Sequence, residues 1–347
     1  MALGGVGHET AATLPGSMRA FACRNCGQLV FFENDACLNC GTALGFDWPA
    51  RELLTLFESR PRCANAELAA CNWLVEEPGE LCFSCALTRT RPADGDELGL
   101  RELRVAEDAK RRLLFELGEL GLPISPRHNG DSGLAFDLLS SAWEPVTTGH
   151  ADGVITLDLA ESDDSHRVAL REQMGEPYRT VVGHLRHEIG HYYFPILTSD
   201  DPALARAREL FGDERADYSA ALERHYADGP PPGWETDHVS AYAAMHPAED
   251  WAETFAHYLH IRDALQTAGA YGVRVDGPQA PARGGLESAP DDGDWDFEAA
   301  LADWLPLTYA LNAINRSMGR SDLYPFVLSE PVTRKLAFVD ERVRAAA

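Results

Sequence analysis

The stretch of sequence that decides the fold lies near the middle of the chain and reads Gly183-His184-Leu185-Arg186-His187-Glu188-Ile189-Gly190-His191-Tyr192-Tyr193. It belongs to residues 178–194, whose pattern predicts a helix stopped by Pro195. His187 and His191 are four residues apart, so they share a helical face and can reach one metal ion. Glu188 then sits beside the metal, where it can take a proton from a bound water and protonate the leaving amine. The alternative is a helix whose histidines are ordinary surface or core residues.

The residues after the second histidine exclude one class of zinc site. A catalytic zinc takes three protein ligands and leaves the fourth position open. In metzincins the third ligand is a histidine six residues after the second one, with a glycine between them. This chain has Phe194 and Leu197 at those two positions. The third ligand must therefore come from another part of the chain.

A later predicted helix, residues 247–262, offers that ligand. Glu249, Glu253 and His257 recur every four residues and share one helical face. We predict that Glu249 is the third ligand and that Glu253 and His257 lie behind the ligands and orient them. Asp250 and Glu253 are the fallback ligands.

Each of these residues also has an interpretation without a metal. Glu249 stands where a capping box places its glutamate, two residues after a proline at the first helical position. His246 and His257 could be buried, hydrogen-bonded histidines. Tyr242, seven residues before Glu249, could stabilise an oxyanion by donating a hydrogen bond, or could pack in a loop. The sequence leaves these alternatives open.

The eight cysteines form two groups of four within an N-terminal segment, namely Cys23, Cys26, Cys37 and Cys40, then Cys63, Cys71, Cys82 and Cys85. The first group consists of two Cys-x2-Cys pairs, each followed by glycine, and this pattern is typical of a structural zinc site. The second group has one open pair, and we predict a second structural zinc there. The alternative is buried free cysteines that pack as small hydrophobes. A segment this short gains little from a purely hydrophobic core, and zinc commonly supplies the missing stability.

Length, charge and composition limit the classes of protein that remain. A chain of 347 residues suggests two domains, and the last cysteine places the boundary near residue 90, with a zinc-ribbon domain over 20–90 and a second domain over 91–347. The net charge of −25 argues against nucleic acid and anionic membrane as partners. No apolar run is long enough to span a membrane. The small and polar residues 1–19 predict a disordered N-terminus without a secretory signal, so the cytoplasm is the expected location.

Outside these motifs the pattern predicts mostly helices. One strand is recognisable over 153–157, bounded by turn residues, and further helices are expected over 102–120, 201–226, 297–318 and 332–343. Residues 272–294 are rich in glycine, proline and aspartate, which predicts a loose insertion. The expected class is α+β: a cysteine module followed by a mostly helical domain with a small sheet.

Taken together, these motifs resemble those of known protein families. The pattern Tyr242-x6-Glu249-x3-Glu253 after a His-Glu-x-x-His helix resembles the lethal-factor-like and Pro-Pro endopeptidase group of zincins. Over roughly residues 20–345, the chain is more closely similar to a bacterial family of zinc-binding metallopeptidases with an N-terminal zinc ribbon. The stretches that carry this similarity are residues 23–27, 71–75, 178–180, 183–193, 211–215 and 246–260.

The resemblance implies a zincin-like metallopeptidase domain and a role for each matched residue. It implies that Tyr242 stabilises the oxyanion, that Glu249 is the third zinc ligand and that Glu253 supports the ligands. In zincins the substrate lies beside an edge strand above the metal, and we expect residues 153–158 to be that edge. His184, one helical turn before the first zinc-binding histidine, would then face near the site as a substrate contact or a structural residue.

Together these observations predict a zinc-dependent peptidase with one catalytic and two structural zinc ions and with Glu188 as general base. The negative charge of the long C-terminal part favours neutral or basic peptide or protein substrates over acidic ones. One alternative is a non-catalytic zinc scaffold whose ribbon and zincin fold bind peptide or protein partners. Another is a metal hydrolase that cleaves a non-peptide amide. The oligomeric state is left open.

Overall fold

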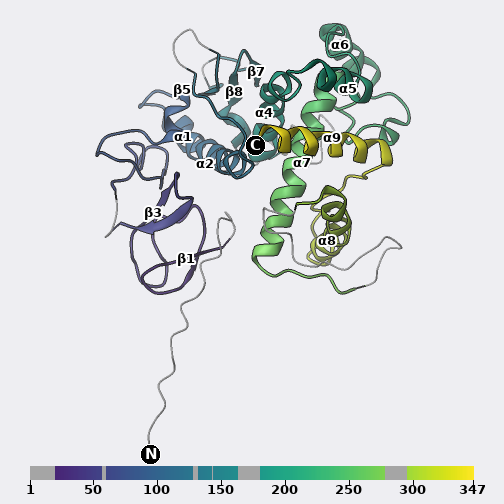
Figure 1. Cartoon of the computed structure of the whole chain (residues 1–347). Coiled ribbons are helices and arrows are strands. Elements are labelled where there is room, and N and C mark those ends of the chain that lie inside the picture. The colour runs from purple at the N-terminus through teal and green to yellow at the C-terminus, as the bar shows by residue number, and fades with distance from the viewer. Residues whose placement is uncertain (1–19, 57–59, 128–131, 143, 163–179, 278–294) are drawn as a thin grey trace, which may run out of the picture.

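A computed structural model describes residues 20–56, 60–127, 132–142, 144–162, 180–277 and 295–347 of the chain (Figure 1). Its strands are β1 (Phe21–Ala22), β2 (Leu29–Val30), β3 (Leu44–Asp47), β4 (Glu52–Thr55), β5 (Thr88–Thr90), β6 (Ala135–Leu139), β7 (Gly149–Ala151) and β8 (Val154–Asp158). Its helices are α1 (Phe83–Ala86), α2 (Glu97–Glu119), α4 (Val181–Leu197), α5 (Asp201–Phe211), α6 (Tyr218–Asp228), α7 (Pro247–Ala270), α8 (Phe297–Ser317) and α9 (Glu330–Ala346), with 3-10 turns η1 (Leu159–Ser162) and η2 (Trp234–Thr236).

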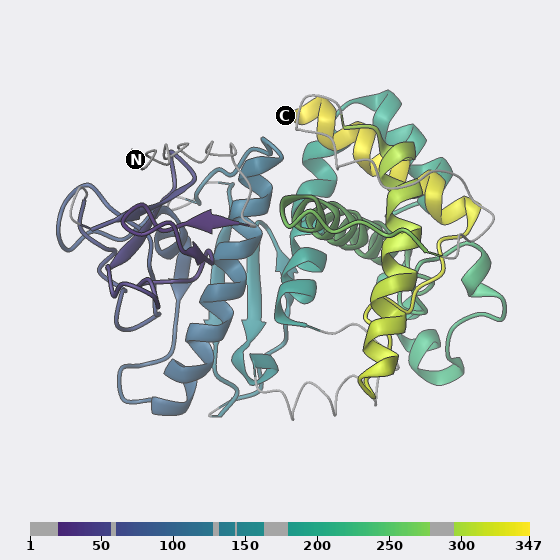
Figure 2. The same ribbon diagram turned by 90° about the horizontal axis from the view of Figure 1, so that it is seen from below.

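The molecule is mostly helical with small sheets, which confirms the predicted α+β class. The cysteine module lies at one end and α7, α8 and α9 lie at the other, with α2, the larger sheet and α4 between them (Figures 1 and 2). Residues 1–19, predicted to be a disordered N-terminus, lie outside the described residues. So do residues 278–294 of the predicted insertion and the first two residues of the helix predicted from 178.

The cysteine module packs directly onto the rest of the molecule. It contains two small antiparallel hairpins, β1–β2 and β3–β4. Phe32 and Phe46 form its aromatic centre with Trp73, and both also contact Phe115 of α2, with ring centroids 5.3 and 5.6 Å apart. One continuous hydrophobic core therefore joins the module to the C-terminal part.

The larger sheet has the strand order β5-β6-β8-β7, and this order corrects one prediction. The expected edge strand, residues 153–158, corresponds to β8, which lies between β6 and β7. Asp152 and Gly153 both have positive φ, 48° and 81°, and this two-residue turn folds β7 back antiparallel to β8. The short β7, which precedes the turn, is therefore the edge on this side.

Several helix boundaries also differ from the expectation: α7 ends at Ala270 rather than at residue 262, and α2 begins at Glu97 rather than at residue 102. Helix α4 continues to Leu197, so the prediction that Pro195 stops it was wrong. Pro195 lies in the last turn, and the helix closes just beyond it with the amide of Thr198 bonded to the carbonyl of Phe194. The single helix expected over 201–226 is two helices, α5 and α6, because Gly212 takes a φ of 97° and ends α5.

Close packing of α4 against α7 positions the candidate site. Gly190 of α4 lies so near α7 that an added Cβ would be 3.0 Å from the Cα of Ala252. The indole of Trp251 donates a hydrogen bond of 2.9 Å to the carbonyl of Gly190. The absence of a side chain at residue 190 thus lets the two helices cross at short range.

Candidate metal centre and active site

Three side chains from α4 and α7 converge on one point. The Nε2 atoms of His187 and His191 are 3.2 Å apart. Oε2 of Glu249 lies 2.9 Å from Nε2 of His187 and 3.5 Å from Nε2 of His191. Ligands about 2.0 Å from a tetrahedral zinc lie about 3.3 Å from each other, so these separations fit one zinc ion.

The position of Glu249 follows from the start of α7. His246 caps this helix through its imidazole Nδ1, which accepts a hydrogen bond from the amide of Ala248. The Glu249 carboxylate therefore does not serve the cap and points toward the histidines of α4. Its Oε2 atom is buried and has no hydrogen-bond partner among the described residues, as expected of an atom that binds a metal.

Neighbouring groups in the cluster shift the pKa values of Glu249 and His187 so that the charged form of each is favoured. Burial raises the pKa of Glu249, but the imidazoles of His187 and His191 beside its Oε2 atom lower it well below its usual range. Burial likewise disfavours the charged form of His187, and the carboxylates of Glu249 and Glu253 raise its pKa well above the usual value. The cluster thus contains an ionised carboxylate, which is the form that binds zinc.

Glu253 and Asp250, the two fallback ligands, point away from this cluster. Oε1 of Glu253 lies 2.7 Å from Nδ1 of His187, and its Oε2 accepts a hydrogen bond from Ser240. The contact between Glu253 and Nδ1 of His187 leaves Nε2 of His187 facing the cluster. This is the arrangement expected of a residue that orients a ligand. Asp250 instead pairs with the buried Lys335, whose Nζ is 2.6 Å from Oδ2.

Glu188 is buried beside the cluster on the same helix. Its Oε1 atom lies 3.2 Å from Nε2 of His184. Burial raises the pKa of Glu188, but the hydrogen bond from His184 and the nearby histidines lower it below its usual value. The carboxylate is therefore ionised at neutral pH and can accept a proton.

Tyr242 stands beside the cluster, with its ring centroid 6.0 Å from that of His187. Burial and the charge of Glu249 raise the pKa of its phenol far above the usual value. The hydroxyl therefore stays protonated and can donate a hydrogen bond.

His257 faces a different region. Its Nδ1 atom lies 2.6 Å from the hydroxyl of Tyr324, and its ring packs edge-on against Phe326. It is one turn beyond Glu253, whose charge acts on it and raises its pKa against the larger, lowering effect of burial.

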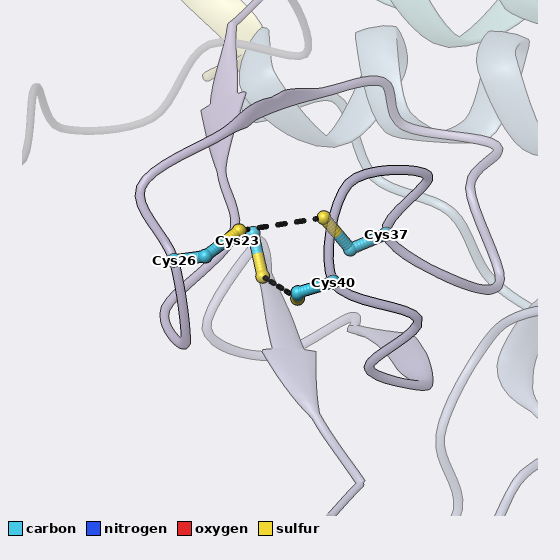
Figure 3. A group of neighbouring side chains, drawn as sticks. All are labelled: Cys23, Cys26, Cys37 and Cys40. Carbon is cyan, nitrogen blue, oxygen red and sulfur yellow. Dashed lines mark hydrogen bonds between the residues drawn. The ribbon is translucent and has the colours of Figure 1, made fainter.

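The two cysteine groups also have the geometry of metal sites. Figure 3 shows the first group, in which the sulfurs of Cys23 and Cys40 are 3.8 Å apart and those of Cys26 and Cys37 are 3.6 Å apart. In the second group the sulfurs of Cys71 and Cys82 are 3.6 Å apart. A disulfide would need about 2.05 Å, whereas four thiolates around one zinc lie about 3.8 Å apart.

The surroundings of the sulfurs agree with this interpretation. Gly27 and Gly41 follow the two pairs of the first group with φ of 75° and 70°, a conformation that favours glycine. In the second group the amide of Cys82 donates to the sulfur of Cys63, and the amide of Cys85 donates to the sulfur of Cys82. All four sulfurs of each group lie within 4.8 Å of one another.

Comparison with known proteins now identifies the family. Residues 100–342 match a family described as "Putative zinc-binding metallo-peptidase", and residues 20–96 match a family described as "zinc-ribbon domain". The chain belongs to this zinc-binding metallopeptidase family. The resemblance to a zinc-binding metallopeptidase family with an N-terminal zinc ribbon is thereby confirmed.

Relatives within the metallopeptidase family come from mycobacteria. A protein of Mycobacterium tuberculosis, Rv2568c, is 56% identical over 328 residues, which cover 93% of this chain and 94% of the relative. A protein of Mycobacterium bovis, Mb2598c, has the same identity and coverage. No solved structure matches the chain significantly. Among the residues that the structure describes, no helix has the length and apolarity needed to cross a membrane.

The structure of this metallopeptidase-family chain brings two residues to the site that the sequence analysis did not select. The hydroxyl of Tyr218, at the start of α6, donates a hydrogen bond of 3.0 Å to Oε1 of Glu249. His150, on the edge strand β7, stacks on His191 with ring centroids 6.4 Å apart. Neither has a fixed spacing to the His-Glu-x-x-His helix, so no local pattern points to them.

Proposed function

We propose that this protein is a zinc-dependent peptidase. His187, His191 and Glu249 hold the catalytic zinc, and Glu188 is the general base. The observation that carries the proposal is the convergence of these three ligand atoms next to a buried, ionised glutamate. Membership in a zinc-binding metallopeptidase family supports it.

The roles of the residues follow from their positions. Zinc, when bound, polarises the scissile carbonyl and acidifies a water molecule to a pKa of about 7. Glu188 takes the proton of the attacking water and then delivers it to the leaving amine. Tyr242, which stays protonated, donates a hydrogen bond to the developing oxyanion. Glu253 holds His187 in the orientation that presents Nε2 to the ion.

The two cysteine groups hold two structural zinc ions in this proposal, which makes three zinc ions per chain. We propose a zinc-ribbon domain over 20–90 and a peptidase domain over 91–347. The substrate is a peptide or protein, and the net charge of −25 favours a neutral or basic one. Its backbone would lie along β7, the edge strand of the described sheet that contacts α4.

The test combines metal analysis with two variants of one type. Glu188→Gln should keep three zinc ions per chain and lose about 10²- to 10⁴-fold in kcat/KM, because it removes a general acid–base group. Glu341→Gln, at an exposed carboxylate on α9, is the matched control and should change neither quantity. Zinc is measured by mass spectrometry, and cleavage is measured on a peptide library.

The results distinguish the proposed peptidase from a non-catalytic zinc scaffold and from a hydrolase of another amide. Full activity in Glu188→Gln would overturn the mechanism. Zinc-loaded protein that cleaves no peptide would favour the non-catalytic scaffold, or a hydrolase of another amide if such a compound is cleaved instead. Two zinc ions per chain, neither of them lost in His187→Ala, would rule out the catalytic centre.

A further inference from the structure

A series of hydrogen-bonded, partly or fully buried side chains leads from the sheet to the general base. The hydroxyl of Thr148 donates a hydrogen bond of 2.8 Å to Oε1 of Glu161, in η1. Oε2 of Glu161 lies 2.6 Å from Nδ1 of His184. Nε2 of His184 lies 3.2 Å from Oε1 of Glu188. These hydrogen-bonded side chains therefore connect the segment before β7, the turn η1 and helix α4.

His184, in the middle of this series of side chains, has the carboxylate of Glu161 on one side and that of Glu188 on the other. A neutral imidazole has one N–H, so it could donate to Glu161 or to Glu188 but not to both. Both contacts are hydrogen bonds when both ring nitrogens of His184 carry protons. The side chains of His184 and Glu161 are 14% and 6% exposed, so little water reaches either contact.

The arrangement fixes one of the two oxygens of the base. In the described part of the chain, His184 is the hydrogen-bond partner of the Glu188 carboxylate. A carboxylate with one oxygen held keeps its other oxygen in a defined direction. His184 and Glu188 are also one helical turn apart, so the bond needs no change in the backbone of α4.

We propose that His184 is a positioning residue for Glu188, and that Glu161 holds His184 in place. This inference rests on the proposed peptidase function, because it assigns His184 a task in that reaction. It makes His184 neither a zinc ligand nor a substrate contact. The parallel is Glu253, which orients the ligand His187 in the same way that Glu161 orients His184.

The first experiment measures turnover. His184→Leu should lower kcat by about 10- to 100-fold, the usual loss when a residue that orients an active-site group is removed. The KM for the same peptide and the zinc content should stay within about twofold of wild type. His184→Gln, whose amide can still donate to Glu188, should recover part of kcat. Glu161→Gln should weaken kcat, and combined with His184→Leu it should add nothing further.

His238→Leu is the matched control, because His238 also lies beside a carboxylate, 3.7 Å from Asp250, but away from Glu188. It should leave kcat unchanged. Unchanged kcat in His184→Leu would overturn the proposal. So would a rise in KM alone, which would identify a substrate contact, or a loss of zinc, which would identify a role in metal binding.

A second measurement separates this inference from the proposed function. High-resolution structures of zinc-loaded wild type and His184→Leu report the Glu188 carboxylate directly. We expect one conformer in wild type and a displaced or divided carboxylate in the variant. If wild type cleaves no peptide, the proposed function fails, and the structures still decide: an unmoved Glu188 in His184→Leu overturns the positioning role.

Discussion

At the scale of single residues, the site combines buried groups whose charges are balanced by specific neighbours. Glu249 and Glu188 are buried carboxylates and Glu253 is a half-buried one, and each stays ionised because a histidine lies within hydrogen-bond reach. For Glu253, these contacts overcome burial and lower the pKa to about 2. Removing any one partner would leave an uncompensated charge, which is costly in a buried site.

His257 allows a residue-level prediction about pH and stability. Burial lowers its pKa to about 4, with Glu253 opposing the shift. The ordinary value in an unfolded chain is about 6.5, so between these values the unfolded chain binds more protons than the folded one. The free energy of unfolding should therefore fall as pH drops from about 6.5 to 4, by up to about 3 kcal/mol from this residue.

The measurement compares wild type with His257→Asn by urea unfolding across that pH range. Asparagine can keep a hydrogen bond to Tyr324 but has no proton to gain, so its stability should depend less steeply on pH. Zinc release at low pH affects both proteins alike. Equal slopes would mean that His257 is not buried as a neutral imidazole.

At the scale of elements, the crossing of α4 and α7 brings the ligands together. The two histidines belong to α4 and the glutamate to α7, so a change in the spacing of these helices moves all three ligand atoms. Gly190 sits at the closest approach, one residue before the second histidine. The distance between the helices is therefore set within one turn of the metal site.

Gly190→Ala should both destabilise the protein and weaken the centre. The added Cβ meets backbone atoms of Ala252, which cannot move aside as a side chain could. Overpacking of this kind costs about 1–3 kcal/mol, and the better helix propensity of alanine recovers about 1 kcal/mol at most. Thermal unfolding and zinc titration measure the two effects. Gly95→Ala, which adds a methyl group in open space, should change neither.

At the scale of the whole molecule, the cysteine module is part of the scaffold. Phe115 of α2 contacts its aromatic centre, and β5, just after the last cysteine, pairs with β6 of the larger sheet. All four cysteines of the second group are buried, whereas Cys26 and Cys40 of the first group are exposed. The second group is therefore the more enclosed of the two.

Loss of the second cysteine group should therefore affect the whole molecule more than loss of the first. Cys71→Ser should lower the Tm of the entire protein and reduce its activity, because structural zinc sites contribute several kcal/mol or more to folding. Cys40→Ser, at an exposed ligand of the first group, is the comparison and should cause a smaller loss. Calorimetry and zinc analysis provide the readouts. Equal Tm shifts in the two variants would contradict this ranking.

The sequence by itself determined whatever depends on local spacing. Histidines four residues apart share a face of a helix, two Cys-x2-Cys pairs each followed by glycine predict a metal site, and the helical spacing of apolar residues predicts the mostly helical part of the α+β class. Spacing within one helix predicted that His187 and His191 share a face, and spacing within a second helix offered Glu249, Asp250 or Glu253 as the third ligand, with Glu249 preferred. The cysteine groups could be predicted for the same reason.

Only the tertiary structure decided the contacts between elements. Tyr218 reaches Glu249 from α6, Glu161 reaches His184 from η1, and β7 takes the sheet edge that was expected of β8. Such contacts depend on how helices and strands pack, which no fixed separation along the chain encodes. The sequence thus determined which groups face the metal, and packing decided which groups hold them in place.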